Sequence, residues 1–265
     1  TSYNLAGGYY NVSVEATNEA GTKGSADAST VDGLKLVVKE TVAPVITIVS
    51  PTAGAYVANS KQPVVFNITD ETGGSGVDIS TLVVKQDDTA VASANITHTA
   101  ISNGYSVTYT PSAALSDGSH TVTINCKDHD GNAAAKKSTT YTVDTVPPTL
   151  NVTSPADGLI TAASSVTVAG TTNDATSSPV VITISLNGTD QGTVAVGTGG
   201  TFSKVITLKE GSNTIIVKAK DAAGKESSVT RTVTLDTSVP KIKAATITPN
   251  PVDTGKTMVI SVTIE

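Results

Sequence analysis

Three stretches of this sequence align with one another without gaps, and no other feature limits the possible folds as strongly. They read LAGGYYNVSVEATNEAGT from Leu5, LSDGSHTVTINCKDHDGN from Leu115 and LKEGSNTIIVKAKDAAGK from Leu208. In the second copy Val122, Ile124 and Cys126 occupy alternate positions, and the other copies hold apolar residues at the same places. This two-residue period predicts a β-strand with one buried face, on which Cys126 is a small core residue rather than a reactive thiol. A strand repeated three times indicates a chain of repeated β-modules.

A second repeated element contains proline and marks the module boundaries. Pro44 and Pro148 stand at the same distance before a Ser-Pro pair, in KETVAPVITIVSP and VDTVPPTLNVTSP. Proline before an alternating strand is typical of a stiff linker that enters the first strand of a new module. We predict four segments: the last strands of a partial module at 1–43, complete modules at 44–145 and 146–238, and the first strands of a further partial module at 239–265.

Module length and strand spacing predict the fold class. Each complete module has about one hundred residues, with short alternating strands and turn signals, as an immunoglobulin-like sandwich requires. The chain has two Phe and no Trp, and is rich in Thr, Val and Ser, which favours strands over helices. We therefore expect an all-β chain of tandem immunoglobulin-like β-sandwiches arranged as an extended rod. The strands are expected near 45–49, 64–68, 80–85, 95–101, 104–109, 120–126 and 138–143, then near 149–153, 165–170, 180–186, 193–196, 202–207, 213–219 and 228–235.

The two end segments each resemble only part of a module, and two explanations fit them. In one, the sequence is a section of a longer tandem array. In the other, a terminal strand pair of one molecule completes the sandwich of the next, which open strand edges and apolar faces favour.

One module resembles a known family. Segment 154–237 is similar to the bacterial immunoglobulin-like family that includes the B domain of glucodextranases. The similarity rests on Ser154-Pro155, Gly158, Val166, Val168, Gly170, Gly200-Thr201-Phe202, Glu210-Gly211-Ser212-Asn213 and Asp221-Ala222-Ala223-Gly224. Module 44–145 matches in part, because NGYSVTYTP replaces the Gly-Thr-Phe step. The resemblance implies non-catalytic spacers or adhesive arms on secreted enzymes, bacterial surface proteins and phage tails, and ITPNPVDTGKTMVISV is similar to segments of phage virion proteins.

The segment KDHDGNAAA looks at first like the start of an EF-hand loop. An EF-hand needs Gly at its sixth position and Glu at its twelfth, where this chain has Ala133 and Thr139. The other copies of the repeat keep only an Asn or Asp at the first place and the Gly. A side-chain oxygen that bonds a nearby backbone N–H, followed by Gly with positive φ, closes a hairpin. The segment therefore predicts a turn and not an EF-hand.

A different ion site is compatible with the sandwich topology. The exit of the second strand, the turn between the sixth and seventh strands and the incoming linker are expected at one pole of a module. Acidic residues at these positions would converge at two junctions and hold calcium through hard oxygen ligands. The alternative is that they cap turns and stay solvated. The candidate ligands are Glu40, Asp70 and Asp128 at one junction, and Asp144, Asp174 and Asp221 at the next.

The sequence disfavours several classes of function. The net charge of −6 gives no general attraction for nucleic acid, and no apolar run is long enough for membrane insertion. The three histidines His98, His120 and His129 fall at scaffold positions, without a visible catalytic, metal or phosphate-loop arrangement. We therefore expect no enzyme.

The expected role is a non-enzymatic structural or adhesive arm outside the cytoplasm, on a bacterial cell surface or a virion. Its expected partners are neighbouring modules of a larger protein or virion, and a cell-surface protein or glycan receptor. The alternative is a carbohydrate-binding accessory module of a secreted enzyme, although exposed aromatic side chains for sugar stacking are scarce. Phe66 and Phe202 are predicted to lie in the cores.

Overall fold

The computed structural model describes residues 8–26, 35–248 and 250–264. Contacts divide the chain into two compact units, which are treated separately below. The first contains residues 1–147 together with 174–179 and 221–225, and the second contains 148–173, 180–220 and 226–265. The secondary-structure elements among the described residues are strands, apart from two three-residue 3-10 turns, η1 Ser93–Asn95 and η2 Thr198–Gly200. None of the described helical segments has the length or apolar character to cross a membrane.

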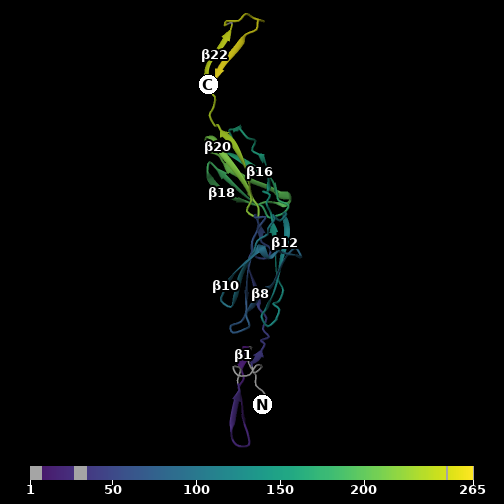
Figure 1. Ribbon diagram of the computed structural model, residues 1–265. Coiled ribbons are helices and arrows are strands. Elements are labelled where there is room, and N and C mark those ends of the chain that lie inside the picture. Colours follow the sequence, from purple (N-terminus) through teal and green to yellow (C-terminus); the bar gives the residue numbers. More distant parts are fainter. Residues whose placement is uncertain (1–7, 27–34, 249, 265) are drawn as a thin grey trace. The chain divides into compact units, whose positions relative to one another are not determined.

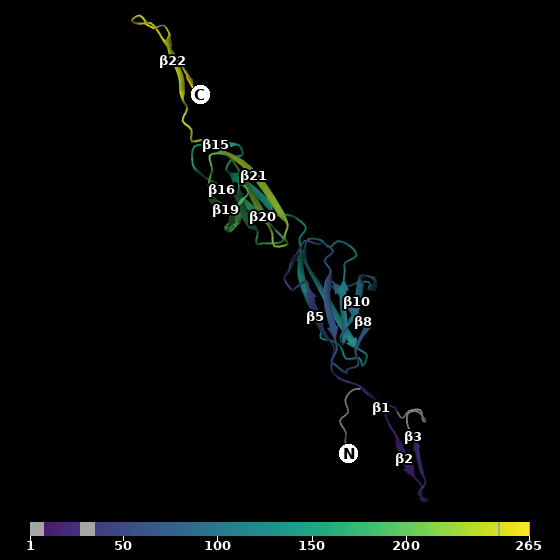
Figure 2. The same cartoon turned by 90° about the vertical axis from the view of Figure 1, so that its left-hand side faces the viewer.

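Two sheets of mainly antiparallel strands form the first sandwich (Figures 1 and 2). One has the order β10-β11-β7-β5, and the other has the order β6-β13-β12-β8-β9, in which β6 runs parallel to β13. This two-sheet arrangement confirms the predicted all-β, immunoglobulin-like class. The strands are β5 Val45–Ser50, β6 Tyr56–Val57, β7 Val64–Thr69, β8 Val77–Gln86, β9 Thr89–Ala90, β10 Ile96–Ile101, β11 Gly104–Tyr109, β12 Gly118–Asp128 and β13 Lys137–Val143.

Alternation along the strands places the core of the first sandwich. On β12 every second residue from His120 is buried, and Val122, Ile124 and Cys126 have no exposed surface. On β7 the same period buries Phe66. Full burial of each aliphatic or aromatic side chain contributes about 1.5–3 kcal/mol, so this shared interior holds the two sheets together.

The second sandwich repeats the plan. One sheet has the order β14-β16-β19, and the other has β15-β21-β20-β17-β18, with β15 parallel to β21. Its core includes Phe202, Ile215 and Val217, and the buried positions of β20 fall on alternate residues, as on β12. The strands are β14 Thr149–Ser154, β15 Leu159–Thr161, β16 Ser165–Asn173, β17 Val181–Leu186, β18 Thr189–Val194, β19 Thr201–Thr207, β20 Gly211–Lys220 and β21 Glu226–Leu235.

Strand pairs also form in the end segments. In the first unit β1 Gly8–Asn11 pairs with β4 Lys35–Val38, and β2 Val14–Thr17 pairs with β3 Lys23–Ala26. In the second unit β22 Ile242–Thr248 pairs with β23 Val259–Ile264. Every described residue of β22 and β23 is exposed, so this hairpin packs no apolar face against the rest of its unit. The predicted partial modules at 1–43 and 239–265 stay predictions.

The fourteen predicted strands all overlap observed ones, with one large displacement. We expected a strand near 193–196, whereas β18 spans Thr189–Val194. Asn187 and Gly188 both have positive φ, 51° and 79°, so β17 turns directly into β18 through a two-residue hairpin. The short strands β6, β9 and β15 were not predicted, because two or three residues are too few to show a period.

Candidate metal centres

Asp144, Asp174 and Asp221 lie together in the first unit. Asp144 follows β13, Asp174 opens segment 174–179, and Asp221 opens segment 221–225. One carboxylate oxygen of each residue lies within 4.8 Å of those of the other two. The structure thus brings together the three acids that the sequence placed at one junction, while their binding of an ion stays a prediction.

Strand alternation explains why Asp221 is buried. On β20 the inward positions are Asn213, Ile215, Val217 and Ala219, and Asp221 continues the same series one step beyond the strand. Its exposed fraction is 5%, and that of Asp144 is 0%. Since each successive inward position adds about 7 Å along a strand, the series delivers a carboxylate to the end of the core.

Backbone and hydroxyl donors hold the cluster. Asp174 Oδ1 accepts from the N–H groups of Thr176 at 2.8 Å and Ser177 at 2.7 Å. The Ser177 hydroxyl donates to Asp144 Oδ2, and Ser177 is itself fully buried. The backbone N–H of Ala222 donates to the Ser177 carbonyl at 3.2 Å. Segment 174–179 therefore contacts both the end of β13 and segment 221–225.

One buried oxygen of this cluster has no hydrogen-bond donor. Asp221 Oδ1 accepts from the Lys225 N–H at 2.8 Å, but the buried Oδ2 has no hydrogen-bond partner. The ion pairs among the described residues involve other acids, so no described Lys or Arg forms a salt bridge with the cluster. Two unit charges 4 Å apart near a protein surface repel by about 4 kcal/mol. Three clustered carboxylates without a counter-charge are therefore a costly arrangement.

The second cluster consists of Glu40, Asp70 and Glu71, whose ligand atoms also lie within 4.8 Å of one another. Asp70 follows Ile68 on the inward series of β7 and is 7% exposed. Its Oδ2 accepts from the Gly76 N–H at 2.8 Å, while its buried Oδ1 has no hydrogen-bond partner. Ser75 donates from its hydroxyl to Glu40 Oε1 at 3.1 Å.

Asp128 is joined to Glu40 through an amide rather than placed in this ligand group. Asn132 donates from its backbone N–H to Asp128 Oδ1 and from Nδ2 to Asp128 Oδ2, both at 2.8 Å. The same Nδ2 lies 3.2 Å from Glu40 Oε1. Burial favours the neutral form of Asp128, but the Asn132 hydrogen bonds outweigh it and hold the pKa of Asp128 below its ordinary value. Both oxygens of Asp128 are thus already satisfied.

Sequence reasoning missed three residues of this region. Glu71 joins the cluster directly after Asp70, although nothing at its position repeats in the other module. A backbone hydrogen bond opposes the shift, but burial and the carboxylates of Asp70 and Glu40 raise the pKa of Glu71. Asp130 Oδ2 accepts from the Glu40 N–H at 2.9 Å. Asn132 bonds Asp128 and occupies the repeat position that holds Lys225 in the second module. The alignment of the copies could therefore have revealed it.

The turn prediction at the repeated slot is confirmed in all three copies. A side-chain oxygen of Asn18, Asp128 or Asp221 accepts from the backbone N–H four residues later, at 2.9, 2.8 and 2.8 Å. The following glycines Gly21, Gly131 and Gly224 have φ of 77°, 97° and 91°, which L side chains seldom adopt. Asp128 and Asp221 are therefore turn formers, and Asp221 in addition belongs to a carboxylate cluster.

Both clusters have the chemistry of a hard cation site. They offer carboxylate and hydroxyl oxygens without His or Cys, which suits calcium and does not suit zinc. In the Asp144 cluster the ligands would be Asp144, Asp174 and Asp221, with Ser177 beside them. In the Glu40 cluster they would be Glu40, Asp70 and Glu71.

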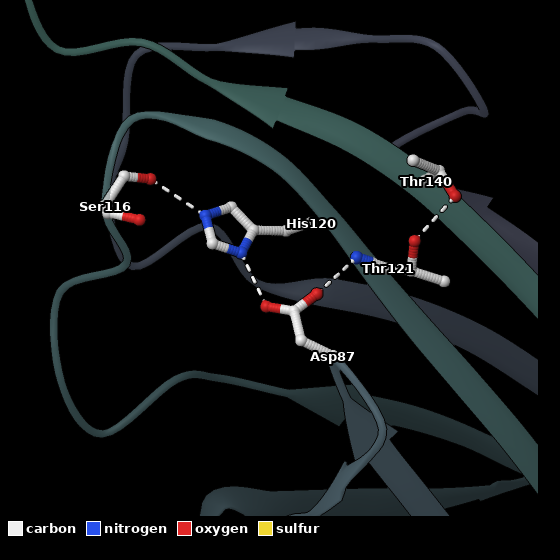
Figure 3. A network of polar contacts seen from close by, with 5 residues as sticks. All are labelled: Asp87, Ser116, His120, Thr121 and Thr140. Atoms are coloured by element: carbon white, nitrogen blue, oxygen red, sulfur yellow. Dashed lines mark hydrogen bonds and ion pairs between the residues drawn. The ribbon is translucent and has the colours of Figure 1, made fainter.

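A polar network at the start of β12 is the nearest approach to a catalytic dyad (Figure 3). His120 Nδ1 lies 2.7 Å from Asp87 Oδ2, and Nε2 lies 2.8 Å from the carbonyl oxygen of Ser116. Asp87 Oδ1 accepts from the Thr121 N–H at 2.8 Å. Because the ring meets the carbonyl of Ser116 and not its hydroxyl, this arrangement does not activate a serine nucleophile.

The second module builds the same joint from amides. Asn213 stands in the place of His120 and Asn187 in that of Asp87, with Asn187 Nδ2 donating to Asn213 Oδ1 at 3.1 Å. Asn187 Oδ1 accepts from the Thr214 N–H at 2.8 Å, as Asp87 accepts from Thr121. Two chemically different pairs with equivalent contacts indicate a structural joint between strands.

The remaining polar candidates lie apart from this network. His98, for which the sequence showed no partner, packs edge-on against Tyr105 with ring centroids 5.2 Å apart. His129 is an exposed turn residue. Cys126 is fully buried, as predicted, and this burial raises the pKa of its thiol although Thr81 and the Lys127 carbonyl lie near the sulfur.

Two family models match separate parts of the chain. Residues 148–237 match the glucodextranase domain B family, and residues 53–145 match a bacterial Ig-like domain family. These matches confirm the resemblance to bacterial immunoglobulin-like modules, and each covers less than half of the chain. The predicted boundaries near 44, 146 and 239 stay predictions. None of the curated proteins compared with the sequence matches it.

Solved structures resemble the chain only distantly. The fibronectin(III)-like modules of Clostridium thermocellum CbhA share 16% identity over 72% of this chain and 94% of theirs, with a TM-score of 0.46. Domains A168-A170 of titin share 13% identity over 86% of this chain and 72% of theirs, with a TM-score of 0.45. A structure from a 1.5-MDa bacterial ice-binding adhesin shares 23% identity over 86% of this chain and 75% of its own, with a TM-score of 0.34. These values are too low to indicate a shared function.

Proposed function

Two modules of this chain are bacterial immunoglobulin-like, and from this premise we propose that the chain is a non-enzymatic structural or adhesive arm. It is displayed outside the cytoplasm, on a bacterial cell surface or a virion. The family matches support the module type. The proposal assigns the chain neighbouring modules of a larger protein or virion as its partners, and a surface protein or glycan as its receptor.

The observation that carries this proposal is the replacement of His120 and Asp87 by Asn213 and Asn187 in the equivalent joint. An active site would keep its titratable groups, whereas a scaffold keeps only the hydrogen bonds between its strands. One pair joins the turn after β8 to β12, and the other joins the turn after β17 to β20. What the two modules share is therefore a connection between strands. We therefore assign His120 and Asp87 a structural role in the sandwich.

A parallel strand pair in each sandwich, β6 with β13 and β15 with β21, supports a load-bearing role. β6 runs parallel to β13, with Thr142 N–H donating to the Ala55 carbonyl at 2.8 Å and Asp144 N–H to the Val57 carbonyl at 2.9 Å. When a chain is pulled from its ends, an early strand and a late strand that are parallel are drawn in opposite directions along their lengths. Their hydrogen bonds are then loaded together in shear and not broken one at a time.

Single-molecule force spectroscopy of the whole chain tests the arm. We expect two separate unfolding events, one for each sandwich, each lengthening the chain by roughly 0.36 nm for every residue released. Thr142→Pro removes the N–H that bonds Ala55 and should lower the unfolding force of one event only. A chain that extends without resistance, with neither event visible, would refute a load-bearing role.

A carbohydrate-binding accessory module remains the competing proposal, and the placement of the aromatic rings weighs against it. Phe66, Phe202, Tyr109 and Tyr141 are at most 4% exposed, whereas Tyr56 is 38% exposed. A shallow hollow of about 210 Å³ on the first sandwich has no aromatic side chain in its lining, which is formed by Val83, Lys85, Thr123, Asn125 and Lys136. Sugars stack on exposed rings, so a glycan array should give no clear hit. Reproducible binding to one glycan class would favour this competitor.

A further inference from the structure

We propose that Asp144, Asp174 and Asp221 form a calcium site that ties the end of β13 to segments 174–179 and 221–225. The proposal adds an ion site to the structural role proposed above. Any effect of calcium on the resistance of the chain to pulling rests on that role. The binding itself does not, because it depends only on the geometry of the cluster within the first unit.

The first argument is an unpartnered oxygen. Asp221 is 5% exposed, its Oδ1 is held by the Lys225 N–H, and its Oδ2 is buried without a donor. A buried carboxylate oxygen without a hydrogen bond is strongly unfavourable unless a cation meets it. The nearby carboxylates of Asp144 and Asp174 are acceptors and supply no proton donor of their own when ionised.

The second argument is a comparison between the two modules. In the first module Asn132 donates to both oxygens of Asp128, the counterpart of Asp221. In the second module Lys225 takes the place of Asn132, and only its backbone N–H bonds Asp221. The amide that satisfies the acid in one module is missing from the other, at the point where three carboxylates converge.

The ligand class follows from the donor atoms. Calcium takes six to eight oxygen ligands and tolerates irregular geometry, so carboxylates on turns suit it and waters or carbonyls complete its shell. Magnesium requires a nearly ideal octahedron and gives up its water reluctantly, so it is expected to bind this cluster less tightly. Zinc prefers nitrogen and sulfur ligands, which this cluster does not offer.

A second, weaker calcium site is carried independently by Asp70. Its Oδ1 is buried and unpartnered beside Glu40 and Glu71, and the residue is 7% exposed. Ser75 and Asn132 already donate to Glu40 Oε1, at 3.1 and 3.2 Å. Calcium must displace or share these donors, so we expect the Glu40 cluster to bind less tightly than the Asp144 cluster.

Titration of the whole chain tests both sites. The chain is stripped with EDTA, and then calcium chloride or magnesium chloride is added at constant ionic strength, with isothermal titration calorimetry and thermal unfolding as readouts. We expect calcium to bind with two affinities and to raise the melting temperature, with a smaller effect of magnesium. Calcium that produces neither heat nor a melting shift in the unmodified chain overturns the proposal.

Two variants assign the tighter site. Asp221→Asn keeps the oxygen that accepts from Lys225 and replaces the unpartnered oxygen with an amide donor. It should therefore raise the melting temperature of the metal-free chain while weakening the tighter calcium affinity at least roughly tenfold. Asp174→Asn should weaken the same affinity, and it keeps an oxygen for Thr176 and Ser177. Asp190→Asn is the matched control, because its side chain is exposed and bonds only the Gly192 N–H.

Each outcome separates the site from the proposed function. If Asp221→Asn leaves both affinities unchanged, calcium binds elsewhere and the assignment is wrong. If Asp221→Asn fails to fold, the Asp174→Asn titration decides by the same criterion. If calcium does not bind but the unfolding forces are as expected, the structural arm stands and only the calcium site is refuted. If calcium binds but the chain shows no mechanical resistance, the calcium site stands and the load-bearing role is refuted.

Discussion

His120 and Asp87 are paired at the start of β12 in the first sandwich, with Nδ1 and Oδ2 separated by 2.7 Å. The other ring nitrogen faces the Ser116 carbonyl at 2.8 Å. Both partners can only accept hydrogen bonds, so both ring nitrogens must carry hydrogen for the two contacts to form. The geometry therefore fits the imidazolium form, although the side chain of His120 is only 9% exposed.

This pair should make the stability of the first sandwich depend on pH. Burial lowers the pKa of His120, but the hydrogen bonds to Asp87 and Ser116 outweigh it and raise the pKa above its ordinary value of 6.5. Burial likewise opposes the hydrogen bonds that lower the pKa of Asp87 below 3.8. The stabilisation is therefore complete between about pH 4 and 6.5, and is lost as pH rises through the folded pKa of His120 or falls through that of Asp87.

Urea unfolding from pH 3 to 8.5 measures this dependence. We expect the free energy of unfolding to fall by about 1 kcal/mol above neutral pH. The value is modest because Asp87 is partly exposed and screened by solvent. The neighbouring Tyr109 and Tyr141 have pKa values raised by burial, that of Tyr141 to about 12, so they stay neutral throughout. The double variant His120→Asn with Asp87→Asn imitates the second module. A pH profile identical in this variant and the unmodified chain would contradict the assignment.

The thiol of Cys126 should react slowly in the folded chain. It is fully buried, and burial raises its pKa, so the reactive thiolate is scarce at neutral pH. Ellman's reagent should label it only at the rate of unfolding, and rapidly in urea. Cys126→Ala should cost about 1 kcal/mol, since Ala occupies this position in the other copies of the repeat. Fast labelling without denaturant would contradict the burial.

Gly170→Ala should destabilise the second sandwich by about 2–4 kcal/mol, because two strands approach closely at this point. An added Cβ would lie 2.1 Å from the Asn151 carbonyl oxygen and 2.8 Å from Phe202 Cζ. Neither the backbone of β14 nor a core ring can move away cheaply. Gly24→Ala is the control, since nothing lies within 4 Å of its Cβ position. Equal melting temperatures for both variants would show that β14 and β16 have room to separate.

The two cores should respond separately to mutation. Val122 and Ile215 occupy the same position of the repeat, and both are fully buried in different core clusters. Val122→Ala and Ile215→Ala should each cost about 2–4 kcal/mol, and each should shift only one of two calorimetric transitions. A single transition that moves with either variant would indicate that the sandwiches unfold together.

The predictability of the candidate sites differed between the two clusters. Asp144, Asp174 and Asp221 were identified because each follows a strand with a clear period, and topology then fixes which strand ends share a pole. Glu71 was missed because it follows Asp70 directly, where side-chain direction depends on the local bend and not on strand alternation. Asp130 and Asn132 were missed as partners of Glu40, because their contacts cross about ninety residues of sequence.

The short strands show the same division. β6 and β15 take their place from the parallel neighbours β13 and β21, whose free edges they satisfy. Two or three residues carry too little hydrophobic pattern to predict an edge strand. Asn187 and Gly188, in contrast, directly follow the strand expected near 180–186, so this turn could have been predicted from its residue types.

The sequence alone determined the β class, the repeated strand with its inward face, and the turns closed by an acid or amide and a glycine. These depend on local periods and on backbone preferences that each residue carries by itself. Only the tertiary structure decided which oxygens meet, that Asp221 keeps one without a donor while Asp128 does not, and that the pKa of His120 is raised by its partners. Those properties arise from the spatial sum of burial, hydrogen bonding and charge, which distant segments create when the sheets close.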